Sequence, residues 1–427
     1  MTTLIRNIGE IFGILPPGVL KKEGAQMNEV QSLRNAFLIV RDGLIAGFGE
    51  EGKERPEDFL SEEEQFHDGE GASPVTTVDA KGGYVLPAFC DSHTHIVYAG
   101  CRDGEFRDKI DGLSYEEIAA RGGGILNSAD LLHETSEDEL YRQSAERAEE
   151  VMRMGTGSLE IKSGYGLTTE DELKMLRVIR RLRENFPMEI RSTFLGAHAV
   201  GRAYAGRQSE YVDLVCREML PRVAEEGLAD FVDVFCDRGF FTPEETARIL
   251  ETAAGYGLTP KIHANELAPS GGVQVGAAHG ALSVDHLEQT TDSEIRCLAE
   301  HRHTMPTMLP GASFFSNLPF GNAKGFIRAG LGLALASDFN PGSCPCLNLQ
   351  FVINLGCLKY KLTPEEVLTA VTLNGAAAID MADKVGSVEP GKQADLVIWD
   401  APDLDYICYR VGSNLTRHVI KKGAVVR

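Results

Sequence analysis

The chain has 427 residues, of which 43% are hydrophobic and 25% charged, as is usual for a globular enzyme. Its formal net charge of −21 argues against binding to nucleic acid or to anionic membrane surfaces. Nine scattered cysteines and the lack of a long apolar run favour a reduced, cytoplasmic chain with no signal peptide and no transmembrane helix.

The first 85 residues have the pattern of short β-strands. The apolar segments 36–40 and 44–48 flank Asp42-Gly43, a pair that is typical of a tight hairpin turn. The acidic stretch from Glu50 to Glu70 is expected to be an exposed loop, because a run of like charge is best solvated. Residues 1–85 therefore predict the N-terminal part of a small β domain.

From residue 86 onward, short apolar segments alternate with amphipathic helices. Five Ser/Thr-to-Glu spacings predict helix starts with capping boxes, at Ser136, Thr169, Thr242, Thr291 and Thr363. Eight segments are expected to be strands: the run ending at His95, then 158–162, 189–198, 231–235, 259–263, 282–286, 303–308 and 331–337. Eight alternating units predict an α/β fold, a TIM (β/α)8 barrel over residues 86–384. A doubly wound sheet is the alternative, which the lack of a Gly-rich phosphate fingerprint disfavours.

Strand character returns after residue 384, in segments 394–400 and 417–426. Too little chain remains there for an independent hydrophobic core. We therefore expect residues 385–427 to join residues 1–85 in one small β-sandwich domain that is built from both chain ends.

Polar side chains gather where the expected barrel strands end, which is where TIM barrels place catalytic residues. His93 and His95 are two residues apart, so a strand presents both imidazoles on one face. The strand bodies are interpreted as apolar. Six of the eight strand exits carry such polar residues: His93, His95, Tyr165, His198, His263, Glu266, His286 and Asp338. Structural alternatives stay open: a packing role for His198, an ordinary loop position for Tyr165, a helix N-cap at Asp338, and an ion pair between Glu266 and His286.

Four of these residues, His93, His95, His263 and Asp338, form a set of three nitrogens and one oxygen. Such a set suits one zinc or iron ion with room for water. A bound ion of this kind lowers the pKa of its water toward neutrality. Glu266, His286 and Asp338 are then the candidates for the proton transfer that the catalytic step needs.

The motifs resemble those of the amidohydrolase superfamily, in segments 91–95 and 386–397. Within that superfamily the chain resembles the imidazolonepropionase family, in segments 95–102, 115–125, 162–167, 262–266 and 338–342. The resemblance implies a hydrolase of L-histidine degradation, which opens the ring of 4-imidazolone-5-propanoate to give N-formimidoyl-L-glutamate. The alternatives are a deaminase of a purine, pyrimidine or triazine ring, and a non-catalytic metal-binding barrel.

The resemblance also implies the roles of the site residues. The metal ligands fall on the four residues chosen above, and Glu266, His286 and Asp338 fall in catalytic positions. Substrate contacts fall on Arg102, Tyr165, His198, Glu266, Asn340, Gly342 and Ser343. Arg102 is a natural bidentate partner for the propanoate carboxylate. No lysine suited to carbamylation ends the fourth strand, so one zinc or iron ion per subunit is expected rather than a bridged pair. The expected partners are a small-molecule substrate and a second copy of the chain, in a homodimer.

Overall fold

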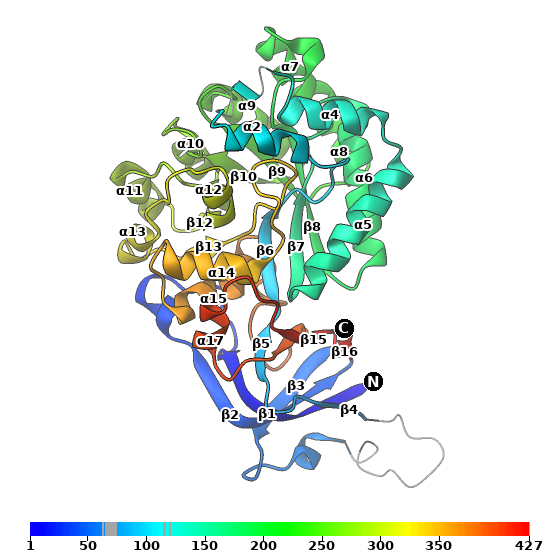
Figure 1. Ribbon diagram of the computed structural model, residues 1–427, viewed down its shortest axis with the longest axis vertical. Helices are drawn as coiled ribbons and strands as arrows, with labels where there is room; N and C mark the ends of the chain where they lie inside the picture. The colour runs from blue at the N-terminus through cyan, green and yellow to red at the C-terminus, as the bar shows by residue number, and fades with distance from the viewer. Residues whose placement is uncertain (62–63, 65–74, 114–116, 119–120, 427) are drawn as a thin grey trace.

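The computed structural model describes residues 1–61, 64, 75–113, 117–118 and 121–426. Figure 1 shows a barrel surrounded by helices, with a β domain below it that contains both chain termini. Of the acidic stretch from Glu50 to Glu70, residues 62–63 and 65–70 lie outside the described residues. So do residues 115–116 and 119–120 of the segment 115–125 that resembles the family.

The barrel consists of eight parallel strands that pair in chain order. They are β6 (Phe89–Thr94), β7 (Thr156–Lys162), β8 (Glu189–Ala197), β9 (Phe231–Cys236), β10 (Thr259–Ala264), β11 (Ser283–His286), β12 (Met305–Met308) and β13 (Ala334–Leu335). A parallel bridge between Thr94 and Phe339 closes the barrel, and the His95 N–H donates to the Phe339 carbonyl at 2.8 Å. The predicted (β/α)8 barrel is therefore confirmed, with all eight strands in their expected places.

Helices follow the strands on the outside of the barrel (Figure 1). They are α2 (Phe106–Ile110), α4 (Ile125–Glu134), α5 (Glu137–Arg153), α6 (Thr169–Asn185), α7 (Gln208–Leu214), the π-helix η5 (Val215–Met219), α8 (Leu220–Glu225), α9 (Pro243–Ala254), α10 (Gly272–Ala278), α11 (Asp292–Glu300), α12 (Pro310–Phe315), α13 (Ala323–Arg328), α14 (Leu349–Leu358), α15 (Pro364–Val371) and α16 (Leu373–Ala377). Complete capping boxes start α9, α11 and α15, as predicted, at Thr242, Thr291 and Thr363. The Ser136 side chain caps α5.

The capping box predicted at Thr169 and Glu172 is wrong by one residue. Thr168 is the N-cap of α6, and its side chain accepts from the Asp171 N–H at 3.2 Å. Two adjacent threonines each have an acidic residue three positions later, so the spacing alone did not distinguish them. Glu172 instead turns into the loop after β7, where its carboxylate accepts three backbone N–H groups, from Gly164, Gly166 and Leu167.

The β domain is built from both chain ends, as predicted. Its strands are β1 (Thr2–Ile14), β2 (Gln31–Arg41), β3 (Leu44–Glu50), β4 (Thr76–Asp79), β5 (Tyr84–Pro87), β14 (Leu396–Trp399), β15 (Thr416–Lys421) and β16 (Ala424–Val425). They pair in one continuous mixed sheet, β16-β15-β14-β5-β1-β2-β3 with β4 on β1, rather than in two separate sheets. The sheet curls around its own core, which includes Ile5, Leu38, Val85 and Ile398. Asp42 and Gly43 both have positive φ, of 50° and 83°, as a tight hairpin between β2 and β3 requires.

The two sheets are joined almost without a break, because β5 ends at Pro87 and β6 begins at Phe89. The Phe89 ring packs against Trp399 of β14, with ring centroids 5.2 Å apart. The short helix α17 (Leu404–Tyr409) follows β14 and contacts α14 and α15.

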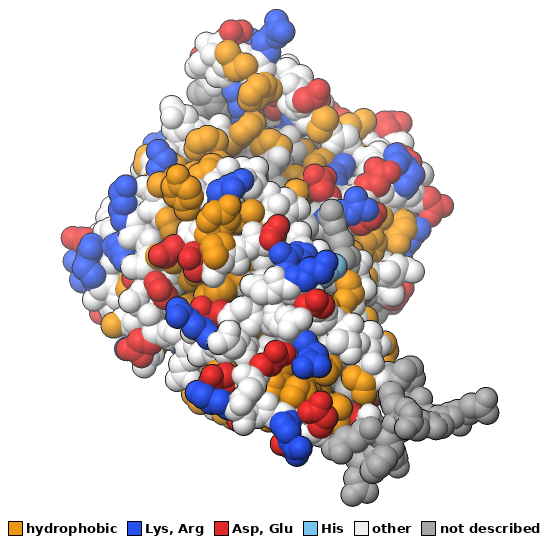
Figure 2. Space-filling model, turned by 60° about the horizontal axis from the view of Figure 1, so that its bottom comes forward, with side chains coloured by type: hydrophobic (Ala, Val, Ile, Leu, Met, Phe, Trp, Pro, Cys, Tyr) orange, Lys and Arg blue, Asp and Glu red, His pale blue; other side chains and the backbone are white. Residues whose placement is uncertain are grey.

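Acidic and basic side chains are interspersed on the face that Figure 2 shows. None of the helices in the described part of the chain is long and apolar enough to cross a membrane.

Glu189, at the start of β8, forms an ionic contact between the barrel and the connection from α16 to β14. Its carboxylate accepts from Lys384 at 2.7 Å and from Gln393 at 3.1 Å. Burial opposes the ionised carboxylate, but these hydrogen bonds outweigh burial and lower the pKa of Glu189 to about 2. A depressed pKa means that the ionised group stabilises the folded state above its unfolded pKa, and that this contribution disappears as the pH falls toward 2.

We therefore expect Glu189→Gln to lower the free energy of unfolding by about 1–2 kcal/mol at pH 7, with a loss that shrinks as the pH falls below about 4. Urea unfolding between pH 3 and pH 7 measures this difference. The exposed Glu184 on α6 supplies a matched control, since Glu184→Gln should leave stability unchanged. A loss for Glu189→Gln that is the same at every pH would contradict the ionic role.

Candidate metal centre and its pocket

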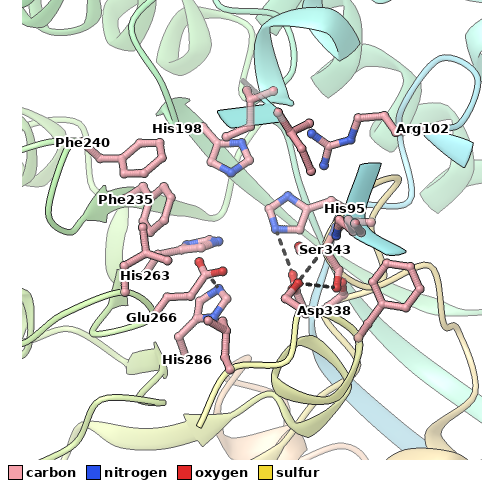
Figure 3. A pocket seen from close by; sticks show the side chains of 18 of the residues that line it. His95, Arg102, His198, Phe235, Phe240, His263, Glu266, His286, Asp338 and Ser343 are labelled. Atoms are coloured by element: carbon pink, nitrogen blue, oxygen red, sulfur yellow. Dashed lines mark hydrogen bonds and ion pairs between the residues drawn. The ribbon is translucent and has the colours of Figure 1, made fainter. Parts of the chain in front are cut away.

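A cavity of about 490 Å³ lies at the carboxyl ends of the barrel strands. Most of the predicted site residues line it: His95, Arg102, Tyr165, His198, His263, Glu266, His286, Asp338, Asn340 and Ser343 (Figure 3). His93 lies fully buried beside His95, and Gly342 packs against the Arg102 guanidinium so closely that no side chain would fit. The structure thus brings all the predicted site residues together, while their individual roles stay predictions.

The candidate metal ligands form two groups of three that share His93. One group is His93, His95 and Asp338, and the other is His93, His263 and His286. In the first group the Nε2 atoms of His93 and His95 are 3.3 Å apart, and they lie 3.5 and 3.6 Å from Asp338 Oδ1. In the second group the rings of His93 and His263 are only 4.4 Å apart. The predicted set of four therefore spans both groups.

Buried carboxylates orient two of the imidazoles. His93 donates from Nδ1 to Asp285 at 2.7 Å, and His263 donates from Nδ1 to Asp233 at 2.8 Å. Each Nε2 is then an acceptor, as metal binding requires. Within the described residues, the buried Nε2 of His263 has no hydrogen-bond partner. A partnerless acceptor beside two facing Nε2 atoms fits a cation between these rings.

His286 differs electrostatically from the other three histidines. Burial lowers the pKa of His93, His95 and His263, so these imidazoles are neutral, the form that binds metals. Burial also opposes a charge on His286, but the carboxylates of Glu266 and Glu288 outweigh it and raise its pKa well above the usual value. Glu266 lies 3.7 Å from His286 Nε2, and Glu288 lies 3.3 Å from Nδ1. A protonated imidazole between two carboxylates would bind a metal poorly, which agrees with the prediction of Asp338 rather than His286 as a ligand.

Beneath the histidines the barrel contains a network of buried charges. Lys162 contacts Glu160 at 2.5 Å and Asp233 at 2.8 Å, and lies 3.6 Å from Asp285. Lys261 contacts Glu160 and lies 3.8 Å from Asp285. All five side chains are fully buried. The interpretation of the strand bodies as apolar is therefore wrong: they carry the ionic groups that fix the carboxylates behind His93 and His263.

The loop after β7 is rigidly held beside the metal candidates. Glu172 binds its backbone, as described above, and Tyr165 within it is only 2% exposed. His198 donates from Nδ1 to the Gly164 carbonyl at 3.0 Å, and its ring stacks on His95 with centroids 5.3 Å apart. Tyr165 and His198 therefore form one wall of the cavity next to His95.

The loop after β13 is organised around Asn340. Its side-chain N–H groups donate to Asp338 Oδ2 at 3.0 Å and to Ser343 Oγ at 2.7 Å. Its side-chain oxygen accepts from the N–H groups of Gly342 at 2.8 Å and Ser343 at 2.7 Å. The Asn340 side chain therefore fixes Asp338 and shapes the loop that faces the cavity.

Four residues other than glycine at the ends of these strands have a left-handed backbone. They are Asn265 with φ of 59°, His286 with 86°, Leu287 with 66° and Asp338 with 55°. Such conformations cost energy and concentrate at functional sites, where the surrounding structure enforces them. Their position after β10, β11 and β13 marks this end of the barrel as the site.

Other cavity residues were missed by the sequence analysis. Lys109 and Arg238 line the cavity together with Phe235 and Phe240, whose rings pack 4.0 Å apart. Phe235 was assigned to a strand but not to the site. Its place two residues after the buried Asp233 put it on the inward face, and this alternation could have identified it. No local pattern marks Lys109, which lies in a short helix of the β6–α4 connection.

The chain is similar to known proteins along its whole length. A family model described as the amidohydrolase family matches residues 84–426. The imidazolonepropionase of Christiangramia forsetii is 48% identical over 427 residues, covering 100% of both chains. That of Flavobacterium johnsoniae is also 48% identical over the full length of both chains. Among solved structures, atrazine chlorohydrolase from Arthrobacter aurescens, complexed with zinc, superimposes with a TM-score of 0.73 at 14% identity, over 99% of this chain and 95% of that one.

The role of the buried charge network in supporting the site can be tested by removing Lys162. Lys162→Met removes a cation that is fully buried among three carboxylates. We expect the free energy of unfolding to fall by about 3–5 kcal/mol, because the remaining buried charges lose their compensation. Urea unfolding of the metal-free proteins measures this loss. Lys53→Met removes an exposed ion pair with Glu50 and should leave stability unchanged. Equal stability of the Lys162 variant and the wild type would refute a supporting role for the network.

Proposed function

The chain belongs to the imidazolonepropionase family of the amidohydrolases, and from that premise we propose how its site performs the reaction. The substrate is 4-imidazolone-5-propanoate, and hydrolysis of a ring C–N bond gives N-formimidoyl-L-glutamate in L-histidine degradation. One observation carries the assignment of the site: three neutral histidines and Asp338, which belong to two groups that share His93, lie at a cavity that the buried Arg102 also lines. The histidines and Asp338 suit a hydrolytic metal ion, and the Arg102 guanidinium suits the carboxylate of the propanoate tail.

We propose that His93, His95, His263 and Asp338 hold one transition-metal ion. Imidazole and carboxylate accept zinc or iron, and the zinc in the related atrazine chlorohydrolase structure supports zinc here. When bound, the ion would polarise the ring carbonyl and lower the pKa of water. Burial raises the pKa of Asp338 to about 8, and a cation beside it would restore the carboxylate.

Glu266 is the proposed proton acceptor. Burial raises the pKa of Glu266 to about 7, so its carboxyl group can accept and release a proton near neutral pH. Glu266 takes a proton from the water whose oxygen bonds to the ring carbonyl carbon. The bond from that carbon to the ring nitrogen then breaks, and the nitrogen receives a proton. In this proposal Asp338 passes that proton to the nitrogen.

His286 acts beside Glu266 in this proposal. Its protonated imidazole lies between Glu266 and Glu288, so an N–H can donate to the carbonyl oxygen as negative charge develops on it. Tyr165 and His198 hold the ring against the wall beside His95. Gly342 and Ser343 complete the substrate contacts from the loop that Asn340 shapes.

Arg102 determines which ring substrates fit. Its side chain is 8% exposed, and its Nε and Nη1 have no hydrogen-bond partner among the described residues. A buried guanidinium without a partner is costly, and a substrate carboxylate satisfies it. An aminated heterocycle without a carboxylate would leave it unsatisfied, which argues against the deaminase alternative.

The predictions of a cytoplasmic location and of a homodimer belong to this proposal as well. Light scattering of the purified protein tests the second, with about twice the 46.5 kDa chain mass expected.

We expect the purified wild type, loaded with zinc or iron, to consume 4-imidazolone-5-propanoate. Loss of the ultraviolet band of the imidazolone measures turnover, and mass spectrometry identifies N-formimidoyl-L-glutamate. His263→Ala removes one proposed ligand, so turnover and bound metal should both be lost.

Glu266→Gln is the matched control, because it removes the proton acceptor and leaves the proposed ligands in place. Its metal content should equal that of the wild type, while kcat falls by roughly 10²–10⁴-fold. Failure of the metal-loaded wild type to turn over the imidazolone would sink the assigned reaction. A fully active, metal-loaded His263→Ala enzyme would sink the assigned site.

A further inference from the structure

A second, half-buried cation lies beside Arg102 at the cavity. Lys109 extends from α2, and its Nζ donates to the Gly342 carbonyl at 2.8 Å. The Arg102 guanidinium packs on the same glycine, since a Cβ built at Gly342 would come within 1.6 Å of Arg102 Nη2. Both side chains line the cavity. The two cations therefore converge on one point of the loop after β13.

No carboxylate of the described residues forms a direct ion pair with either of these two cations. Neither Arg102 nor Lys109 forms a salt bridge within 4.0 Å to any described residue. Burial lowers the pKa of Lys109, and the positive charge of Arg102 lowers it further; the more distant carboxylates of Glu105 and Glu266 offset only part of this effect. Two neighbouring cations that lack a salt-bridge partner beside a cavity favour the binding of an anion there.

The hydrogen-bonding capacity of both groups remains open toward a ligand. Nε and Nη1 of Arg102 have no partner among the described residues. Lys109 has three N–H donors, of which the Gly342 carbonyl takes one. Its ammonium also lies 4.6 Å from the centre of the Phe315 ring, and that ring stacks on Phe106. These contacts hold the ammonium in place at the cavity while leaving donors for a ligand.

We infer that Lys109 is a specificity-determining residue, which binds the carboxylate of the substrate tail together with Arg102. This inference rests on the proposed function and extends it. The guanidinium offers paired donors to the carboxylate, and the ammonium of Lys109 supplies a second positive charge from α2. Substrates with an anionic tail on the ring are thereby favoured over those with a neutral tail of the same size.

Two stable probes test this inference: imidazole-4-propanoate and its primary amide, imidazole-4-propanamide. They differ only in the charge of the tail. Calorimetric binding to the zinc-loaded protein measures both affinities without turnover. We expect Lys109→Met to weaken binding of the propanoate about tenfold and to change binding of the propanamide by less than about twofold. With the natural substrate the same variant should raise KM and leave kcat within about twofold.

Arg107→Met is the matched control, because Arg107 is an exposed cation on the same short helix and does not line the cavity. It should change neither affinity, which excludes a general effect of net charge or of α2. Equal weakening of both probes by Lys109→Met would overturn the inference, since the lysine would then only tie α2 to the Gly342 loop. Unchanged binding of the propanoate would overturn it as well.

These outcomes separate this inference from the proposed function. Turnover of 4-imidazolone-5-propanoate by the wild type, without a selective effect of Lys109→Met, removes the role of Lys109 alone. A zinc-loaded wild type that neither binds the two probes nor turns over the imidazolone removes both proposals together.

Discussion

The pairing of buried imidazoles with buried carboxylates is the constraint on which the site depends. His93 and His263 each donate to an aspartate inside the barrel, and this fixes which nitrogen faces the cavity. Those aspartates are themselves compensated by Lys162, which is fully buried. Charges buried at this depth are tolerated only when their partners are in place. Burial keeps these histidines neutral, and the aspartates orient them before any metal or substrate binds, so that little reorganisation is needed at the site.

The two sheets of the fold support this arrangement from different sides. Closure of the barrel brings β6 next to the segment after β13, where the Asp338 N–H donates to the His93 carbonyl at 3.0 Å. The β domain is attached at the opposite ends of the strands: the fully buried Lys421 of β15 donates to the Gly157 carbonyl in β7 at 2.8 Å and pairs with Asp395. The chain ends thus anchor the base of the barrel and leave the carboxyl ends of its strands free for chemistry.

Much of the site was predictable because parallel strands of a closed barrel end at the same face. The positions of His95, His263 and Asp338 followed from strand assignments alone. The buried ionic groups were not predicted, because strands with charged residues at alternate positions were interpreted as apolar. Lys261 and His263 show the pattern that was missed: they are two residues apart, so both side chains point into the barrel. Nor could the sequence place Lys109 against Gly342, 233 positions away, because this contact depends on how two loops fold over the cavity.

One measurement tests the central claim most directly: anomalous diffraction at the zinc edge from crystals of the zinc-loaded protein. The account predicts a single peak at about 2.0–2.2 Å from Nε2 of His93, His95 and His263 and from a carboxylate oxygen of Asp338, with His286 left between Glu266 and Glu288. A peak coordinated by His286 in place of Asp338, or two neighbouring peaks, would contradict it. Either result would require the proton-transfer roles of these residues to be assigned again.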